Sequence, residues 1–227
     1  MCGRYTFFST KDIVDQYNLI PKEKAQLEIF QDNYNVTPGS EMPVIIRGEQ
    51  QHHLKFMTWG LLLAWSKTEE SGLKLINARV EGLFEKPMWK RLVNSKRCIV
   101  PAKGFYEWLK LADGTKQPFY ITPKTESVFS FAGLWDEWHS PSGEVISTFT
   151  IITTTPNKEM AKIHNRMPAI LSTEQMEAWL SPLELSQSQA DDILRPLPDD
   201  SLEIVRVSKD VNSPRNNREN LIYPLED

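Results

Sequence analysis

Cys2 directly follows the initiator methionine, and it is the residue of this sequence best placed for covalent chemistry. Because the cysteine side chain is small, we expect Met1 to be removed, which would leave an α-amine and a thiol on adjacent carbons. In unperturbed form these groups titrate near ~8 and ~8.5. Such a 1,2-aminothiol forms a Schiff base with an aldehyde, and its thiolate then closes a thiazolidine ring. The terminus could instead attack an amide, or be an ordinary mobile chain end.

Two further residues could transfer protons near neutral pH. Glu107 stands between Tyr106 and Trp108 in a predicted hairpin strand, where burial among aromatic rings would raise its pKa. The alternative is that Glu107 points to water while its neighbours point inward. His164 ends a predicted helix that begins at Thr155-Pro156, and a helix C-terminus stabilises an imidazolium without any catalytic role. Both interpretations of each residue stay open at this point.

Two charged patterns could contact an anion. A strand over Ile76–Glu81 would place the polar side chains of Asn77, Arg79 and Glu81 on one face. A second pattern lies in residues 86–97, which contain no acid and five basic residues: Lys86, Lys90, Arg91, Lys96 and Arg97. A solvated strand face and a solvated helix face explain the two patterns equally well. Neither pattern alone therefore identifies a phosphate-binding site.

The composition is that of a soluble globular protein, with 227 residues, 40% hydrophobic and 25% charged. The net charge of −4 means that any nucleic-acid binding must come from a local patch. Two cysteines provide no disulfide framework, and the four histidines form no recognisable metal-ligand set with them. No signal-peptide pattern and no apolar run of ~18 residues is found. We therefore expect a cytoplasmic protein without metal or cofactor.

Most of the elements that would position these residues are predicted to be short strands. Fifteen prolines favour turns over long helices. A first helix is expected over Ser9–Tyr17 with Ser9 as its cap, and another after the capping box of Ser172 and Gln175. Trp59 and Trp65 are expected in the core. Strands are predicted at Met42–Ile46, Leu54–Trp59, Ile76–Glu81, Ser127–Trp138, Val145–Thr155 and Leu202–Val207, with a hairpin of Gly104–Trp108 and Gln117–Ile121 around Asp113-Gly114.

In their order along the chain, these pieces resemble the SRAP family (SOS response-associated peptidase, also called abasic-site processing proteins). The resemblance extends from residue 2 to about residue 222, and the set of motifs is far more specific than any one of them. The matching elements are Met1-Cys2-Gly3-Arg4, Tyr34-Asn35-Val36-Thr37-Pro38-Gly39, Trp59-Gly60 with Trp65, Asn77-Ala78-Arg79-Val80-Glu81, Pro101 with Gly104-Phe105-Tyr106-Glu107-Trp108, and His164-Asn165-Arg166-Met167-Pro168.

The resemblance implies an α+β fold, a single domain over residues 1–227 with a twisted, barrel-like mixed sheet and short peripheral helices. It also implies covalent cross-linking through Cys2 to abasic sites in single-stranded DNA or at single-strand/duplex junctions, which would shield the lesion in the DNA damage response. By motif position, Asn77 would orient Cys2, Glu107 would move protons, and His164 would assist sugar opening and cross-link reversal. The implied DNA contacts are Arg4, Arg79 and Arg166 to phosphates, Pro38 and Trp65 as wedge or stacking groups, and Asn35 in the turn motif.

This chain departs from the family pattern at two positions. Leu63 replaces the usual proline in the Trp-Gly-x-x-Pro-x-Trp loop, which we expect to make the Trp65 loop more flexible. Lys103 replaces an acidic or amide residue, which we expect to add positive charge near the pocket. The competing functions are a peptidase or amidohydrolase with Cys2 as N-terminal nucleophile, including autocatalytic removal of Met1, and a non-covalent single-strand binding module. We expect a monomer that associates with the nucleoid on damaged DNA and not with membranes.

Overall fold

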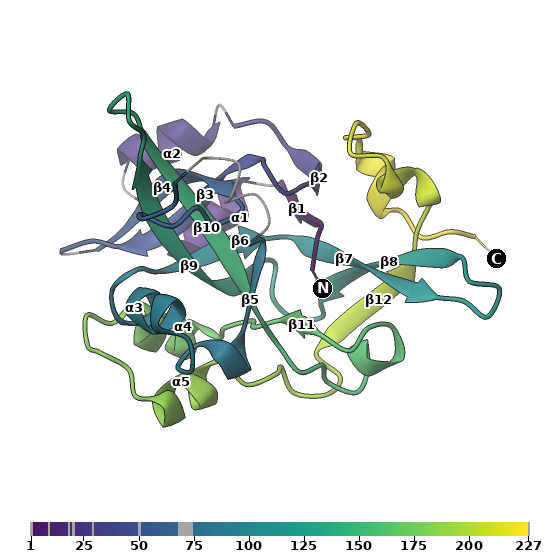
Figure 1. The fold of residues 1–227 in the computed structure, drawn as a ribbon. Coiled ribbons are helices and arrows are strands. Elements are labelled where there is room, and N and C mark those ends of the chain that lie inside the picture. The colour runs from purple at the N-terminus through teal and green to yellow at the C-terminus, as the bar shows by residue number, and fades with distance from the viewer. Residues whose placement is uncertain are drawn as a thin grey trace.

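Five strands close into a barrel at the centre of the molecule (Figure 1). They are β3 (Glu41–Arg47), β4 (His52–Trp59), β6 (Arg97–Ala102), β9 (Phe129–His139) and β10 (Val145–Thr154). The ring is closed because β10 pairs with β9 on one side and with β4 on the other. The β4–β10 pair is parallel and the other four are antiparallel. This computed structural model describes residues 2–8, 10–17, 19, 21–28, 30–49, 51–67 and 75–226.

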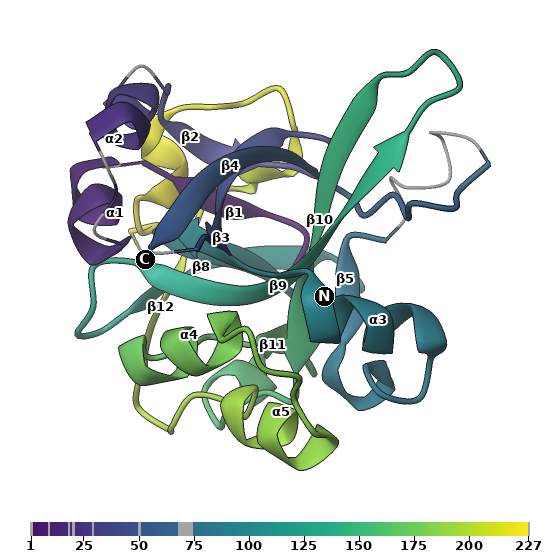
Figure 2. The same ribbon diagram turned by 90° about the vertical axis from the view of Figure 1, so that its left-hand side faces the viewer.

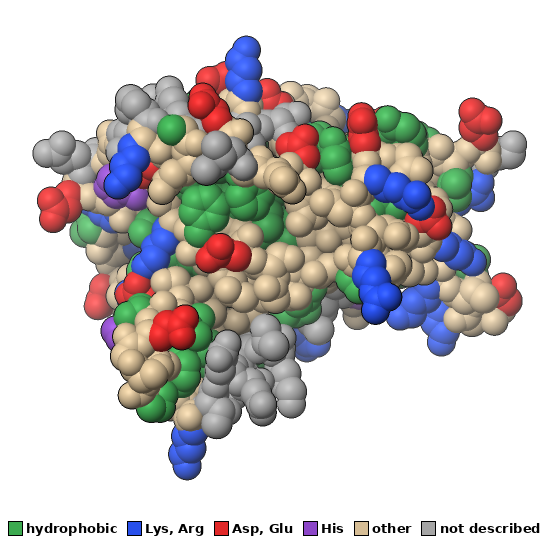
Figure 3. Space-filling view, turned by 90° about the horizontal axis from the view of Figure 1, so that it is seen from above, with side chains coloured by type: hydrophobic (Ala, Val, Ile, Leu, Met, Phe, Trp, Pro, Cys, Tyr) green, Lys and Arg blue, Asp and Glu red, His purple; other side chains and the backbone are tan. Residues whose placement is uncertain are grey.

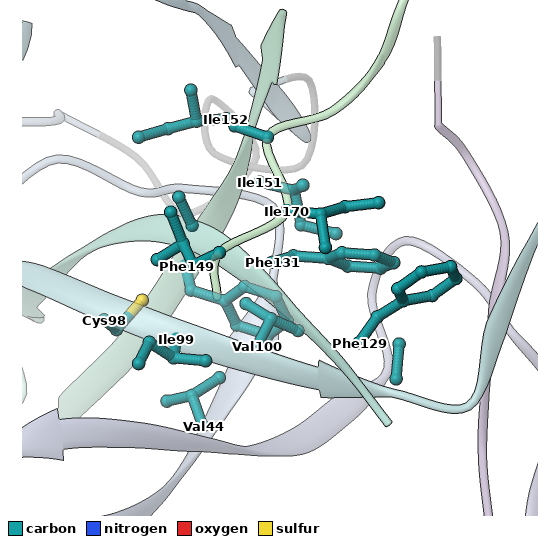
Figure 4. Close-up of a cluster of buried hydrophobic side chains, with 14 of the residues drawn as sticks. Val44, Cys98, Ile99, Val100, Phe129, Phe131, Phe149, Ile151, Ile152 and Ile170 are labelled. Atoms are coloured by element: carbon teal, nitrogen blue, oxygen red, sulfur yellow. The ribbon is translucent and has the colours of Figure 1, made fainter. Parts of the chain in front are cut away.

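Apolar side chains from all sides of the barrel meet in its interior (Figure 4). Val100 on β6, Phe131 on β9 and Phe149 on β10 are fully buried there. Gly133 on β9 allows β6 and β10 to approach closely, since a Cβ atom there would lie 2.8 Å from Cys98 Sγ and 3.0 Å from the Thr150 carbonyl oxygen. The core is thus packed against backbone at this point and leaves no room for a side chain at position 133.

A second, five-stranded sheet continues from the barrel and carries the N-terminus. Its order is β12 (Leu202–Arg206), β8 (Lys116–Pro123), β7 (Gly104–Lys110), β1 (Tyr5–Phe7) and β2 (Asn33–Val36). Lys103 alone separates β6 from β7, so the chain passes directly from one sheet to the other. The predicted Asp113-Gly114 turn joins β7 to β8, with φ of 83° at Gly114, a conformation that glycine adopts without strain. This sheet places Cys2 next to β7.

Short helices cover the barrel on two sides (Figures 1 and 2). The helices α1 (Thr10–Tyr17) and α2 (Pro21–Glu28) lie on one side. The other side carries α3 (Pro87–Ser95), α4 (Thr173–Leu180) and α5 (Gln187–Ile193). None of the helices in the described part of the chain has the length and apolar character needed to cross a bilayer. The predicted α+β fold with a barrel-like sheet and peripheral helices is therefore confirmed.

The individual strand predictions are largely confirmed, and so is the capping box of Ser172 and Gln175, which begins α4. The first helix is also confirmed as α1, while its predicted cap Ser9 lies outside the described residues. The strand expected over Ile76–Glu81 is shorter: β5 comprises Asn77–Arg79, followed by a 3-10 turn over Val80–Gly82. Helices α2 and α5 were not predicted, although Ser186 and Gln189 form a second capping box.

The helix expected from Thr155-Pro156 to His164 is wrong, since this segment contains only a 3-10 turn, Met160–Lys162. Asn157 begins that turn by accepting a hydrogen bond from the Met160 amide at 3.1 Å. The Asn157 side chain also donates to the Pro198 carbonyl at 3.3 Å, and the Lys158 amide donates to Asp199 Oδ1 at 3.0 Å. These bonds to residues 198–199 take up groups that a longer helix would use internally. His164 therefore lies between this tight turn and the short strand β11 (Met167–Pro168).

Candidate functional site

Cys2 lies at the start of a segment that runs antiparallel to β7. Tyr5 is paired with Phe105, and the Tyr106 amide donates to the Arg4 carbonyl at 3.0 Å. The same register continued by two residues places Gly3 opposite Glu107. Cys2 is fully buried, and so is Glu107 apart from 3% of its surface. The pairing of this segment with β7 in the second sheet therefore brings the thiol and the carboxyl group into one buried neighbourhood.

Burial controls the protonation of both groups. It raises the pKa of the Cys2 thiol, and the nearby Glu107 charge raises it further. Burial also raises the pKa of Glu107, while the neighbouring His164 acts in the opposite direction. The expectation that Glu107 is buried and that burial raises its pKa is confirmed. A carboxyl group of this kind holds its proton to higher pH than an exposed glutamate does.

Asn77 reaches Cys2 from β5. This strand pairs in parallel with β10, with Asn77 opposite Ile151. The Asn77 side-chain amide donates to the Cys2 carbonyl oxygen at 2.9 Å, which fixes the position of the backbone that carries the thiol. The Oδ1 atom of Asn77 is buried and accepts no hydrogen bond from any described residue. One buried acceptor is thus left beside the Cys2 backbone.

His164 faces Glu107 from the turn before β11. Its Nδ1 atom lies 3.9 Å from Glu107 Oε1. The backbone amide of Arg166 donates to the same Nδ1 atom at 3.1 Å, and the Arg166 carbonyl lies at 3.2 Å. When Nδ1 accepts from an amide, the proton of the neutral ring is on Nε2, which is then the atom that can donate to a ligand.

The Arg166 side chain is held in place by protein groups. Its guanidinium forms two hydrogen bonds to the carboxylate of Glu81, at 2.5 and 3.0 Å, and one to the Thr153 carbonyl at 2.5 Å. This pairing lowers the pKa of the Glu81 carboxyl group. A phosphate could contact Arg166 only by competing with Glu81. These bonds anchor the segment that carries His164 to Glu81 and to β10.

Arg4 and Asn35 also bind protein groups. Arg4 Nη1 donates to Asn35 Oδ1 and to the Val211 carbonyl, both at 2.7 Å. The Asn35 amide donates to the carbonyls of Ser213 and Asn216 at 3.0 and 2.8 Å. Together they fasten the C-terminal segment to the sheet that carries Cys2. No local pattern indicates this role, because their partners lie at the opposite end of the sequence.

The other predicted DNA contacts are exposed. Arg79 lies on the surface, and no described residue forms a hydrogen bond or ion pair with its guanidinium; Pro38 is exposed in a turn. Trp65 is 55% exposed, so the expectation that it belongs to the core is wrong. Its indole lies over the guanidinium of Arg91, 4.9 Å from the ring centroid. The expectation for Trp59 is confirmed, since that residue is fully buried.

The loop around Trp65 is joined to the barrel on both sides by hydrogen bonds. The Ala64 amide donates to Asp136 Oδ2 at 3.0 Å, and the Ser66 carbonyl accepts from Trp138 Nε1 at 2.7 Å. Leu63 itself is buried in the core. The side chain that replaces the family's proline therefore packs inward and adds an apolar anchor to the loop.

Two predictions of positive charge need correction. Lys103 does not add charge near Glu107, because its ammonium pairs with Asp12 of α1 at 2.6 Å. Arg97 does not belong to a surface patch either, since it is buried and donates to carbonyl groups of Val93, Trp179, Ser181 and Leu183. Arg91 and Lys96 pair with Asp136 and Glu137, which leaves Lys86 and Lys90 as the exposed bases without a carboxylate partner among the described residues.

Glu107 and His164 line an open cleft with a volume of about 360 Å³. The other residues at its wall are Trp108, Lys116 and Asn212. Lys116 and Asn212 were not predicted, and only the adjacency of Trp108 to Glu107 pointed to this wall. Within the ranges that the structure describes, no group of three or more His, Cys, Asp or Glu residues is arranged to hold a metal ion.

Comparisons with known proteins match nearly the whole chain to one family. The family model described as SOS response associated peptidase (SRAP) matches residues 1–214. The abasic site processing protein YoqW of Bacillus subtilis is 42% identical over 226 residues, which cover 98% of this chain and 99% of that protein. The abasic site processing protein HMCES of Gallus gallus is 32% identical, covering 87% of this chain and 67% of its own length.

The fold is also found among solved structures. A crystal structure of a protein from Bacteroides thetaiotaomicron superposes with a TM-score of 0.88 at 30% identity, covering 99% of this chain and all of that chain. A protein from Bordetella bronchiseptica gives a TM-score of 0.74 at 20% identity, covering 91% of this chain, a likeness that concerns the fold alone.

Proposed function

Because this chain belongs to the SRAP family, we propose that it processes abasic sites in DNA by forming a covalent link through Cys2. The link would form on single-stranded DNA or at a single-strand/duplex junction, after removal of Met1. Met1 itself lies outside the described residues. The proposal is carried by one observation, the convergence of Asn77, Glu107 and His164 on the N-terminal cysteine.

The reaction is a condensation without any redox change. An abasic sugar in its ring-opened form presents an aldehyde carbon. The α-amine of Cys2 adds to that carbon, and loss of one water gives an imine. The sulfur then bonds to the imine carbon, and the thiol proton ends on the nitrogen. The product is a thiazolidine, and the single leaving group is water.

In this scheme Asn77, Glu107 and His164 each act at a different point of the reaction. Glu107, with its raised pKa, gives a proton to the departing water and receives the proton of the thiol. Asn77 holds the Cys2 carbonyl, and its unused Oδ1 can accept a hydrogen bond from the freed amine. His164 donates from Nε2 to the sugar oxygen as the ring opens, and takes the same proton back on reversal.

The exposed residues supply the DNA contacts of the proposal. Arg79 is free to meet a phosphate, and Trp65 and Pro38 can stack or wedge beside the missing base. An abasic nucleotide has no base to unstack, so its sugar enters a pocket at lower cost than an intact nucleotide. We further propose that residues 1–227 act as one domain, since one continuous core contains residues from Cys2 to Leu202. We also propose that the protein is a monomer in the cytoplasm.

A denaturing gel tests the proposal. Wild-type protein is mixed with a single strand that carries one natural abasic site, and with the same strand carrying uracil. We expect a species of lower mobility with the abasic strand alone, which Cys2→Ala does not form although it still binds DNA. A non-covalent binding module would give no such species. An N-terminal-nucleophile peptidase would give none either, and would instead release a peptide or amide product. Full cross-linking by Cys2→Ala would refute the assignment.

A further inference from the structure

The cleft beside Glu107 and His164 contains two residues that the proposed chemistry does not use. Lys116 comes from β8 and Asn212 from the C-terminal segment, and both are exposed at the cleft wall. Both stand next to the groups that would act on the abasic sugar. The inference drawn from them rests on the proposed function and concerns how the DNA backbone is held during that reaction.

The side chain of Asn212 has a fixed orientation. Trp108 Nε1 donates to Asn212 Oδ1 at 2.7 Å, so the carbonyl end of the amide faces the indole. The Asn212 backbone is held as well, because Arg4 Nη2 donates to its carbonyl at 3.3 Å and the preceding Val211 is buried. The amino group of Asn212 has no hydrogen-bond acceptor among the described residues. It is thus a preoriented pair of N–H donors at the cleft.

Lys116 brings a positive charge to the same cleft. It is paired across the hairpin with Lys110, and within the described chain no carboxylate lies within ion-pair distance of its ammonium. On the right-hand side of the face in Figure 3, where Figure 1 places the β7–β8 hairpin and the C-terminal segment, Lys and Arg side chains alternate with Asp and Glu side chains. The one acid of the cleft wall, Glu107, has a raised pKa, which weakens its repulsion of an anion.

We propose that Lys116 and Asn212 together bind the phosphodiester group next to the abasic sugar. Phosphate oxygens accept hydrogen bonds from ammonium and amide groups alike, and such contacts fix the register of a strand without reading its sequence. A phosphate held at this wall keeps its own sugar beside Glu107 and His164. The C-terminal segment therefore completes the site, and the anchoring of that segment by Arg4 and Asn35 serves DNA binding indirectly.

The binding test uses a single strand with a tetrahydrofuran in place of the abasic sugar, which lacks the aldehyde and cannot cross-link. Fluorescence anisotropy measures its affinity over a range of salt concentrations. Lys116→Ala is expected to weaken binding about tenfold, as for loss of a charge-assisted hydrogen bond, and to flatten the slope of log affinity against log salt by roughly 0.7. Asn212→Ala is expected to weaken binding by a smaller factor and to leave the slope unchanged. Lys110→Ala is the matched control, with the same charge on the same hairpin but outside the cleft wall.

A second perturbation locates the contact on the DNA. A methylphosphonate, which has no charge, replaces one phosphodiester on either side of the tetrahydrofuran in turn. At one of the two positions it should weaken wild-type binding while having little effect on Lys116→Ala, because both changes remove the same contact. Binding by Lys116→Arg should remain sensitive to the methylphosphonate, because the charge at the cleft wall is kept.

The proposal is overturned if Lys116→Ala and Asn212→Ala bind like wild type, or if Lys110→Ala has the same effect as Lys116→Ala. Full methylphosphonate sensitivity of Lys116→Ala at both positions also overturns it, as does the lack of measurable wild-type binding. Failure of the proposed function is read separately, as the absence of a covalent adduct with natural abasic DNA. All variants are compared by thermal melting, and because both side chains are exposed the melting temperatures should match that of wild type.

Discussion

Replacement of Glu107 by Gln is expected to slow cross-linking while making the protein more stable at neutral pH. Glutamine has nearly the same size as glutamate and keeps one of its hydrogen bonds, but it cannot transfer a proton. Glu107 is only 3% exposed, so bulk water has little access to the position as a substitute proton donor. A positioned acid/base group contributes about 10²-fold or more, which corresponds to about 2.7 kcal/mol of activation free energy.

The pH dependence gives the substitution a second signature. Burial raises the pKa of Glu107 in the folded chain above its value in the unfolded chain. The contribution of this group to stability is therefore fully present below the ordinary glutamate pKa, near ~4.3, and is lost as the pH rises through the raised value. A glutamine side chain cannot ionise, so this loss should be absent from the variant. The free energy of unfolding of Glu107→Gln should exceed that of wild type by a margin that grows over this pH range.

The assays are a single-turnover time course of adduct formation on denaturing gels and urea unfolding, both at several pH values. In wild type, the rate of adduct formation should fall with rising pH over the range in which Glu107 loses its proton. This fall, the alkaline limb of the pH–rate profile, should be missing from Glu107→Gln. Glu107→Asp is the matched control, since it keeps a carboxyl group and should retain the limb at a reduced rate. A wild-type rate for Glu107→Gln, or an unchanged limb, would refute the assignment of proton transfer to this residue.

Three other sets of substitutions separate chemistry from framework. His164→Ala should slow adduct formation modestly and slow DNA release from the adduct more, as measured by a chase with excess unlabelled abasic DNA; wild-type rates in both steps would reduce the histidine to a structural residue. Arg79→Ala should flatten the slope of log affinity against log salt for single-strand binding by roughly 0.7. Arg4→Ala should instead lower the free energy of unfolding by about 1–3 kcal/mol, because it leaves buried acceptors without a donor. The reverse outcome would exchange the roles of the two arginines. Trp65→Ala should weaken binding of a tetrahydrofuran strand by about 1–3 kcal/mol, the stacking contribution of one base, without lowering the melting temperature; an unchanged affinity would remove Trp65 from the interface.

Turns and helix starts could be predicted from the sequence because interactions between neighbouring residues determine them. The turn at Asp113-Gly114 and the capping box at Ser172 depend on neighbouring residues and form as expected. The segment from Thr155 to His164 has helix-start signals too, yet Asn157 and Lys158 bond to residues 198–199 instead. Such a distant competitor leaves no trace in a local pattern.

The candidate site shows the same limit. Cys2 and Glu107 were found because their chemistry is visible in the residue type and in the neighbouring aromatic residues. Whether a given arginine faces DNA or the protein depends on its partners, and Arg4, Arg97 and Arg166 all turn to protein groups. Asn212 was missed for the same reason, since it reaches the cleft only through its bond to Trp108.

Peptide mass spectrometry of the adduct is the most direct test of covalent linkage through Cys2. Wild-type protein is reacted with a single strand containing a natural abasic site, without borohydride, and then digested with nuclease and protease. We predict that the N-terminal peptide begins at Cys2, lacks Met1, and carries the mass of the abasic nucleotide minus one water. An adduct on Lys116 or another lysine, or one on a chain that retains Met1, would contradict the account.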